Sequence, residues 1–274
     1  MPSGSDQSFI ESLIRFGNKL KLELNSSQQS LFGDTSTDTI VKPEPVVSDE
    51  WPLIDKINKE KELIGMYLTA HPLDRFKPEI TNLCNSNFYQ LNNELNTLVG
   101  KDITFVGIVK AFREGISQKN NRPFGNAVLE DFNDTYQLGL WGNDFVNFKN
   151  FFTSGIALLF KWNVEEWASK KDGRKGIAIR LKNIYVLSEV RDELIKAVTI
   201  SAKLEAINEE FINGILKFVN KSEKNKNSKL LQFKIVDEET NIKIDMFSRN
   251  QRLELSDQFF DFIQNFEDVG YQLT

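Results

Sequence analysis

Apolar and polar residues alternate along the middle of this chain, and this pattern constrains the fold more than any other feature. The period of two begins at Lys101 and is clearest in one segment, where Ile156, Leu158, Phe160, Trp162 and Val164 share a face. Because successive side chains of a β-strand point to opposite faces of its sheet, the pattern predicts a strand with one buried face. The opposite face of this segment carries Lys161 and Trp167.

Four further strands and one short helix are predicted in the same region. The strands lie around Ile103–Val109, at Gly125–Asp131, at Tyr136–Trp141 and at Ile177–Leu181, and the helix lies at Asp144–Phe152. The pair Asp172-Gly173 is a hairpin signal between the last two strands. Five strands with a helix between the third and the fourth is the order of an OB fold, a five-stranded β-barrel.

The regions before and after this predicted sheet have different sequence patterns. Helical spacing of apolar residues predicts one helix at Phe9–Leu24 and a second from Pro52 to about Ala70, ended by Pro72. After Ser188 the predicted order is strand, helix, strand, strand, helix, strand, which is a compact α+β layer. The predicted segments, in that order, are Val198–Leu204, Asn208–Val219, Leu230–Val236, Ile242–Phe247, Leu255–Phe266 and Gly270–Thr274.

We therefore predict a mixed α/β chain of several domains. Its parts are a helical tail over 1–24, a flexible linker over 25–50, a helical connector over 51–100, an OB barrel over 101–188 and a C-terminal βαββαβ domain over 189–274. The linker is rich in Ser, Thr, Asp and Asn. The start, Met1–Asp6, lacks the basic and apolar regions of a signal peptide and is expected to be a fragment edge or an expression artefact.

Composition limits the chemistry that the chain can perform. With one cysteine and one histidine among 274 residues, neither a disulfide framework nor a zinc site built from several such ligands can form. No Gly-rich phosphate loop follows a strand, and no Asp-x-Asp pair is present for a two-metal site. His71 is expected to cap or pack between a helix end and Pro72. We predict no catalytic residue, metal or cofactor, no membrane segment, and a reducing cytoplasmic location.

Charge is segregated along the chain. The net charge is −5, yet residues 110–182 hold 12 Lys/Arg and 8 Asp/Glu, so this stretch is +4 and the remainder −9. OB folds bind single-stranded nucleic acid with one face of the sheet. The loops between β-strands one and two and between β-strands four and five also contribute. Basic side chains follow phosphates and aromatic ones stack on bases. The candidate DNA-binding residues are Arg113, Lys119, Arg122, Phe124, Trp141, Lys161, Trp167, Lys170, Lys171, Arg174, Lys175 and Arg180. The alternative is that the basic loops are merely solvated and that the aromatic residues belong to the core.

The linker holds a short peptide of a different kind, Gln28-Gln29-Ser30-Leu31-Phe32. It matches the Q-x-x-L-F pattern that bacterial partners insert into the sliding clamp. Gln28 would make a polar contact while Leu31 and Phe32 fill an apolar pocket, so that two anchors supply most of the binding energy. The alternative is that the Leu-Phe pair packs on the neighbouring helix.

Glu60–Asp74, with the sequence EKELIGMYLTAHPLD, resembles the segment that precedes the OB domain in bacterial C-family replicative DNA polymerases, in their alpha subunit. Ser30–Gly33 and Ile10–Gly17 also look like this family, and the clamp peptide, Glu60–Asp74 and the OB region follow in the family's order. The resemblance implies a non-catalytic C-terminal portion that binds single-stranded template DNA and the sliding clamp (beta subunit). It also implies that the terminal domain docks the tau subunit of the clamp loader.

The chain departs from the family in places. The turn Phe132–Thr135 lacks the glycine that the family often has, and the C-terminal part is acidic. The polymerase palm and its Mg²⁺ ligands are absent, so no catalytic residue is carried over and enzymatic activity is left open. Two rival hypotheses remain. One is a free-standing OB adaptor that binds only protein, and the other is a nuclease or other enzyme with a degenerate site.

Overall fold

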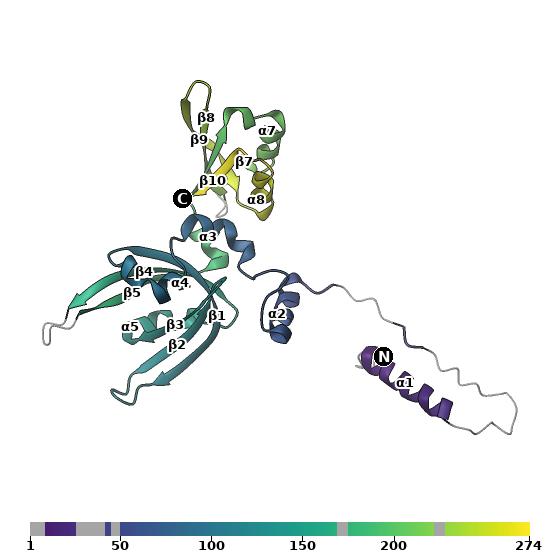
Figure 1. Cartoon of the computed structure of the whole chain (residues 1–274). Coiled ribbons are helices and arrows are strands. Elements are labelled where there is room, and N and C mark those ends of the chain that lie inside the picture. Colours follow the sequence, from purple (N-terminus) through teal and green to yellow (C-terminus); the bar gives the residue numbers. More distant parts are fainter. Residues whose placement is uncertain (1–8, 26–41, 45–49, 169–174, 222–227) are drawn as a thin grey trace. The chain divides into compact units, whose positions relative to one another are not determined.

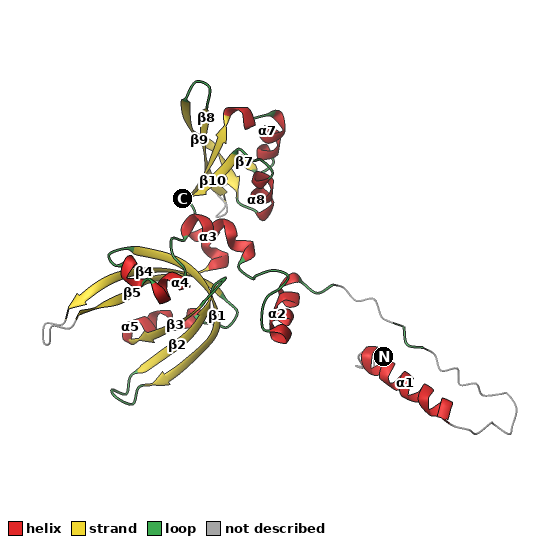
Figure 2. Cartoon of the chain, viewed as in Figure 1, coloured by secondary structure: helices red, strands yellow, loops and turns green. Residues whose placement is uncertain are grey.

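The structure is a computed structural model that describes residues 9–25, 42–44, 50–168, 175–221 and 228–274 (Figure 1). The chain divides into two compact units, Met1–Gly65 and Met66–Thr274. The first unit holds two helices, α1 (Phe9–Asn25) and α2 (Leu53–Ile64). The second unit holds two β-sheets with their helices (Figure 2).

Helix α2 is shorter than its sequence predicts. We expected it to run to about Ala70, but it ends at Ile64. Gly65 adopts a left-handed φ of 89°, and its N–H donates to the carbonyl oxygen of Lys61 at 2.9 Å. A glycine in this conformation closes a helix because it has no Cβ to strain. The glycine, and not Pro72, therefore ends the helix.

The first sheet has five antiparallel strands in the order β3-β2-β1-β4-β5 (Figure 1). The strands are β1 (Asp102–Ile116), β2 (Pro123–Glu130), β3 (Thr135–Trp141), β4 (Ala157–Ala168) and β5 (Lys175–Val186), and α5 (Gly142–Phe148) with a 3₁₀ turn, η3 (Lys149–Phe151), stands between β3 and β4. The long strand β1 pairs with both β2 and β4 and bulges between Val109 and Ala111. The predicted strand order and helix position are confirmed. In the described residues β3 and β5 are not paired, so closure into a barrel stays a prediction.

One face of this sheet carries the main core. Leu158, Phe160, Trp162 and Val164 are fully buried there, as the alternation predicts. The ring of Phe105 lies 5.2 Å from that of Phe160 and 4.6 Å from that of Trp162. The helix α4 (Phe88–Asn93) adds its buried first residue to this cluster, and η2 (Leu95–Leu98) follows it.

The other face of the sheet is covered at one end only. Phe76 of η1 (Asp74–Phe76) and Leu73, directly before it, pack with Val106, Ile108 and Leu159 of the sheet. Ile80 and Leu83 of α3 (Lys77–Leu83) pack against this cluster. The elements η4 (Leu187–Glu189) and α6 (Val190–Glu193) complete this second cluster. Beyond the bulge in β1, the same face is open.

The second sheet forms the C-terminal domain, with strand order β10-β6-β8-β9-β7. Its elements are β6 (Ala197–Lys203), η5 (Leu204–Ala206), α7 (Glu209–Leu216), β7 (Val219–Lys221), β8 (Ser228–Asp237), β9 (Ile242–Glu254), α8 (Asp257–Gln264) and β10 (Val269–Leu273). Strands β6 and β8 are parallel, and the other pairs are antiparallel. The predicted βαββαβ order is present, with one additional short strand, β7. Phe211 of α7 and Phe259 of α8 pack on Val198 and Ile200.

Helix α3 also contacts the C-terminal domain. The backbone N–H of Leu273 in β10 donates to Asn82 Oδ1 at 3.0 Å. The carboxylate of Glu79, fully buried, pairs with Arg191. Arg191 Nη1 lies 2.7 Å from Asp257 Oδ1, at the start of α8. The connector thus packs against both sheets of this unit.

Candidate nucleic-acid interface

The open part of the first sheet presents three short rows of side chains from β1, β2 and β3. The cross-strand register aligns Ala111 with Val128 and Gln137, Arg113 with Asn126 and Gly139, and Gly115 with Phe124 and Trp141. All nine positions are on the face opposite the core, because they alternate along their strands with positions whose side chains pack in or against it, such as Phe112, Ala127 and Leu140. The middle row is polar and the row nearest the hairpin turn is aromatic.

A groove of about 490 Å³ is hollowed into this face. Arg113, Asn126, Gln137 and Gly139 line it. Gly139 gives the groove its depth, because a Cβ added there would lie 2.8 Å from Trp141 Nε1 and 3.6 Å from Asn126 Oδ1. A side chain at this position would fill the floor.

Phe124 and Trp141 form a stacked pair beside the groove. Their ring centroids are 4.7 Å apart and their planes differ by 19°. The Phe124 ring covers Gly115, where an added Cβ would meet it at 2.9 Å. Aromatic side chains commonly cover strand glycines, which is a purely structural role. Trp141 nevertheless stays 56% exposed, so a large aromatic surface is available to a ligand.

The hairpin turn between β1 and β2 carries two of the predicted basic residues. Lys119 and Arg122 are both exposed, and the turn is held by the N–H of Ser117, which donates to the carbonyl oxygen of Arg122 at 2.9 Å. Arg113 was expected in this loop, but it lies within β1. The strand continues past the bulge to Ile116, so Arg113 projects from the sheet face.

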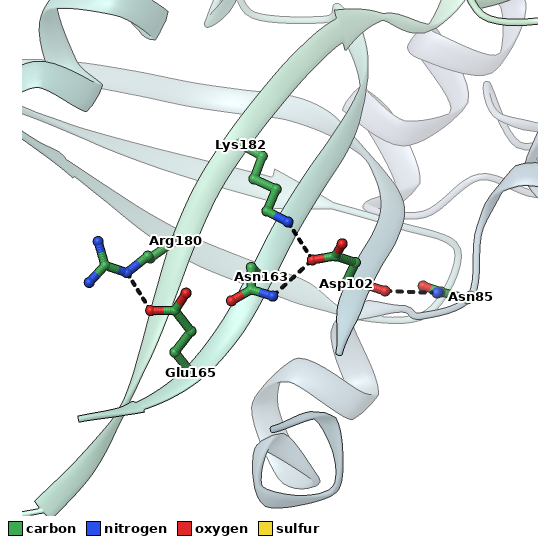
Figure 3. Close-up of polar contacts among 6 residues, drawn as sticks. All are labelled: Asn85, Asp102, Asn163, Glu165, Arg180 and Lys182. Carbon is green, nitrogen blue, oxygen red and sulfur yellow. Dashed lines mark hydrogen bonds and ion pairs between the residues drawn. The ribbon is translucent and has the colours of Figure 1, made fainter. Parts of the chain in front are cut away.

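The β4–β5 hairpin holds the remaining described candidates. Arg180 Nε donates to Glu165 Oε2 at 2.6 Å (Figure 3). Lys161 Nζ lies 5.6 Å from the ring centroid of Tyr185. Both cations therefore already have partners within the chain, which lowers the charge that they offer to a phosphate. Trp167, 45% exposed, lies over Gly176.

Three further predicted residues fall outside the described part of the chain, and one sits at its edge. Lys170, Lys171 and Arg174 precede the start of β5 and are not among the described residues. Lys175 is the first residue of β5 and is exposed. The predicted Asp172-Gly173 turn lies in the same undescribed stretch, but the antiparallel pairing of β4 with β5 on either side of it fits a hairpin.

A polar cluster joins the start of β1 to the middle of β4 and of β5 (Figure 3). Asp102 Oδ1 accepts from Lys182 Nζ at 2.6 Å and from Asn163 Nδ2 at 2.8 Å. The hydrogen bond from Lys182, followed by that from Asn163, holds the pKa of the Asp102 carboxyl below its usual value. Asn85 Nδ2 donates to the backbone oxygen of Asp102 at 3.0 Å. Lys182 is therefore engaged in joining β5 to the start of β1.

No group of three or more His, Cys, Asp or Glu side chains that could hold a metal ion occurs in the part of the chain that the structure describes. His71 packs at the connector, as expected. Its Nδ1 accepts from the N–H of Leu73 at 3.2 Å, and its ring contacts those of Tyr67 and Phe132. Among the described residues, no helix is long and apolar enough to cross a membrane.

Of six residues that share the open face, three were candidates from the sequence and three were not. Arg113, Phe124 and Trp141, chosen for charge and aromaticity, do come together on one face. Asn126, Gln137 and Gly139 were not among the candidates. Their outward position in strands with alternating burial was the available signal, and neither charge nor aromaticity marks them.

Comparison with known proteins shows which proteins this chain resembles in sequence. Residues 198–274 match the family model described as the DNA polymerase III alpha subunit, C-terminal domain. The DNA polymerase III alpha subunit of Haemophilus influenzae is 24% identical over 205 residues, covering 74% of this chain and 17% of that protein. The same subunit of Borreliella burgdorferi is 23% identical over 248 residues, covering 87% of this chain and 20% of that protein. The chain is similar to the C-terminal region of the DNA polymerase III alpha subunit.

The resemblance to the polymerase alpha subunit that the sequence suggested is therefore confirmed. The chain spans about a fifth or less of the length of these alpha subunits. Among solved structures, the yeast mitochondrial single-stranded DNA binding protein Rim1 matches 32% of this chain and 94% of its own, with a TM-score of 0.21 and 19% identity. The Ifi202 HINa domain, solved with duplex DNA, covers 52% of this chain and 73% of its own, with a TM-score of 0.19 and 13% identity. Similarities this low do not bear on function.

Proposed function

We propose that the sheet built from β1–β5 is an OB-fold barrel that binds single-stranded DNA, as the non-catalytic C-terminal part of a bacterial replicative polymerase alpha subunit. The observation that carries the proposal is the stacked pair of Phe124 and Trp141 beside Arg113 on the open sheet face. An exposed indole stacks on any base, and the cation follows the phosphates.

The energies expected from these groups are modest. Stacking on an aromatic side chain contributes about 1–3 kcal/mol per base. Phosphate contacts by Arg113, Lys119 and Arg122 add a contribution that weakens as salt rises, because bound counterions are released. The net charge of −5 does not oppose this binding strongly, since charges beyond about 10 Å are largely screened at physiological salt.

The test is the binding of a fluorescein-labelled dT₁₂ oligonucleotide to the whole chain, measured by anisotropy at several salt concentrations. The Trp141→Leu variant is expected to bind at least about fivefold more weakly, in line with the stacking energy. Trp51→Leu is the matched control, because Trp51 is 57% exposed and Trp141 is 56% exposed. Equal binding by both variants would remove Trp141 from the interface. Salt-insensitive or undetectable binding by the wild type would favour a protein-binding adaptor.

We also propose that the chain binds the sliding clamp (beta subunit) through Gln28, Leu31 and Phe32. These residues lie outside the described part of the chain. Their support is the Q-x-x-L-F pattern and its place before Glu60–Asp74, in the order of the family that the chain resembles. Micromolar binding, on the order of −8 kcal/mol, is expected for the wild type in a titration with purified clamp. Leu31→Ala/Phe32→Ala should abolish it, whereas Ser26→Ala/Ser27→Ala should not.

The C-terminal domain is proposed to dock the clamp-loader tau subunit. An apolar groove of about 260 Å³ between α7 and the β8–β9 hairpin supports this proposal. Ile212, Leu216 and Met246 line it and are 46%, 53% and 43% exposed. Apolar side chains gathered on one exposed surface are typical of a protein interface. Ile212→Asp is expected to weaken binding of purified tau in a pull-down without changing dT₁₂ affinity.

A further inference from the structure

The groove on the open sheet face is lined by more polar side chains than stacking on a base would require. Arg113, Asn126 and Gln137 converge on Gly139 from three strands, and all three are exposed. Among the described residues, these three side chains make no hydrogen bond or ion pair, whereas the acids Glu130 and Glu114 are paired with Lys110 and Lys149. The groove therefore offers free hydrogen-bonding groups around a floor that has no side chain.

The hydrogen-bonding character of these groups is unbalanced. Arginine and the indole Nε1 of Trp141 donate only, and the amides of Asn126 and Gln137 each donate and accept. At the floor, a Cβ added to Gly139 would lie 2.8 Å from the donor Trp141 Nε1 and 3.6 Å from the acceptor Asn126 Oδ1, so the donor is the nearer of the two. No carboxylate is among the described residues that line the groove. Donors thus exceed acceptors.

An unpaired base that enters a groove from a DNA backbone leads with the edge opposite its glycosidic bond. At C6 of the purines and C4 of the pyrimidines on that edge, guanine and thymine carry a keto oxygen, which accepts hydrogen bonds, whereas adenine and cytosine carry an amino group, which donates; guanine also carries a second donor, its 2-amino group. The ring N–H or ring nitrogen beside it can be met by either amide, because an amide both donates and accepts. Only the exocyclic group distinguishes the two classes in a donor-rich groove.

We propose that this groove seats one unpaired nucleobase against Trp141 and selects keto bases over amino bases through Arg113, Asn126 and Gln137. The inference rests on the proposed single-strand binding and adds a base preference to it. Stacking and phosphate contacts hold the strand, while the three polar side chains read the edge of the seated base. An amino group of cytosine or adenine that faces Arg113 or Trp141 Nε1 leaves a hydrogen bond unmade. Among the described side chains that line this groove, only the oxygens of Asn126 and Gln137 can accept from it.

The experiment compares dU₁₂ with dC₁₂, which have the same backbone and ring size and differ at C4 and N3. Anisotropy titrations of the whole chain at one salt concentration are expected to show dU₁₂ binding at least about threefold more tightly, the effect of a single hydrogen bond. Gln137→Glu places an acceptor in the groove at nearly unchanged size. This variant should weaken dU₁₂ binding more than dC₁₂ binding, because a carboxylate accepts a hydrogen bond from the cytosine amino group. The preference for dU₁₂ over dC₁₂ should therefore become smaller or change to a preference for dC₁₂.

Gln118→Glu in the hairpin turn is the matched control, since it makes the same charge change at an exposed position outside the groove. It should weaken both oligonucleotides in proportion and leave their ratio unchanged. Asn126→Asp repeats the test from the neighbouring strand, and far-UV circular dichroism checks that each variant folds. The base preference is overturned if the wild type binds dU₁₂ and dC₁₂ equally well. It is also overturned if Gln137→Glu and Gln118→Glu change the ratio of the two affinities by the same factor. Either result leaves the proposed single-strand binding unaffected. Failure to bind either oligonucleotide overturns the proposed function and this inference together.

Discussion

At the scale of single residues, the reactivity of the Cys84 thiol depends on how the connector packs around it. Its side chain lies among the apolar residues beneath α3, and burial raises the pKa of the thiol from 9.0 to about 12. Because the folded state favours the protonated thiol, this contribution to stability is complete below pH 9 and is lost as the pH rises from there through 12. The thiolate is the nucleophile, so the native thiol should be inert at moderate pH.

We expect iodoacetamide to alkylate Cys84 at pH 8.5 far more slowly in the native chain than in 8 M urea. Since the chain has one cysteine, the mass shift of the whole protein measures this rate without ambiguity. A free thiol such as glutathione, treated in the same buffers, controls for any effect of urea on the reagent. Similar rates for the native and unfolded chains would show that the thiol is accessible in the folded state.

Residues of the candidate interface could be predicted from the sequence only where their charge or aromatic character sets them apart from other surface residues. Charge marked Arg113, and aromatic character near a predicted loop marked Phe124 and Trp141. Amide side chains are common on all surfaces, so Asn126 and Gln137 carry no signal until the register of β2 with β3 is known. That register places Asn126 opposite Gly139, and it depends on backbone pairing that the sequence does not state.

At the scale of elements, Gly107 lets helix α4 pack directly on strand β1. A Cβ added to Gly107 would lie 2.6 Å from Phe88 Cζ and 3.4 Å from Leu129 Cβ. Phe88 is fully buried against Phe105 and Tyr136, so its ring has little room to move. Gly107→Ala is therefore expected to lower the free energy of unfolding by about 1–3 kcal/mol, the usual cost of overpacking.

Urea unfolding followed by circular dichroism measures this change. Gly270→Ala in β10 is the matched control, because it makes the same substitution in a strand where an added Cβ meets nothing within 4 Å. It should change the free energy of unfolding by no more than about 0.5 kcal/mol. If the two variants unfold at the same urea concentration, the contact of Phe88 with β1 is not as close as described.

Elements with a long regular pattern were predictable, and short or polar ones were not. Strand β4 was placed from its alternation alone. The short strand β7 was missed because Val219–Lys221 is too brief to show a period. Strand β9 runs to Glu254, beyond the predicted end at Phe247, because its polar second half pairs with the start of β8 after a register shift at Leu230/Gln232. Pairing between strands, and not composition, defines that half.

At the scale of the whole molecule, no local sequence pattern predicts the contacts that join distant parts of the chain. Leu273 and Asn82 are hydrogen bonded although 191 residues separate them. Glu79 was predicted to lie in a helical connector, yet its carboxylate is fully buried and pairs with Arg191. Helical periodicity gives no reason to expect a buried acid at this position, because the cation that stabilises it comes from a different element.

This ion pair gives the last prediction. Burial opposes the charge of Arg191, but the hydrogen bonds that it donates to Glu79 and to Asp257 outweigh this and raise its pKa. Arg191→Met would leave Glu79 buried without its cation, which is expected to lower the free energy of unfolding by about 3–5 kcal/mol. The fall should be visible as a lower urea midpoint in circular dichroism.

Replacing both partners, as Glu79→Leu/Arg191→Met, should recover most of the lost stability, because a buried apolar pair has no charge to desolvate. Lys196→Met controls for the substitution itself, since Lys196 is exposed. Should the double variant be as unstable as Arg191→Met, the cost would lie in the lost packing of Arg191 on Phe260, whose ring centroid is 5.1 Å from its guanidinium carbon. Recovery, in contrast, would assign the cost to the buried charge at the junction of α3 with the C-terminal domain.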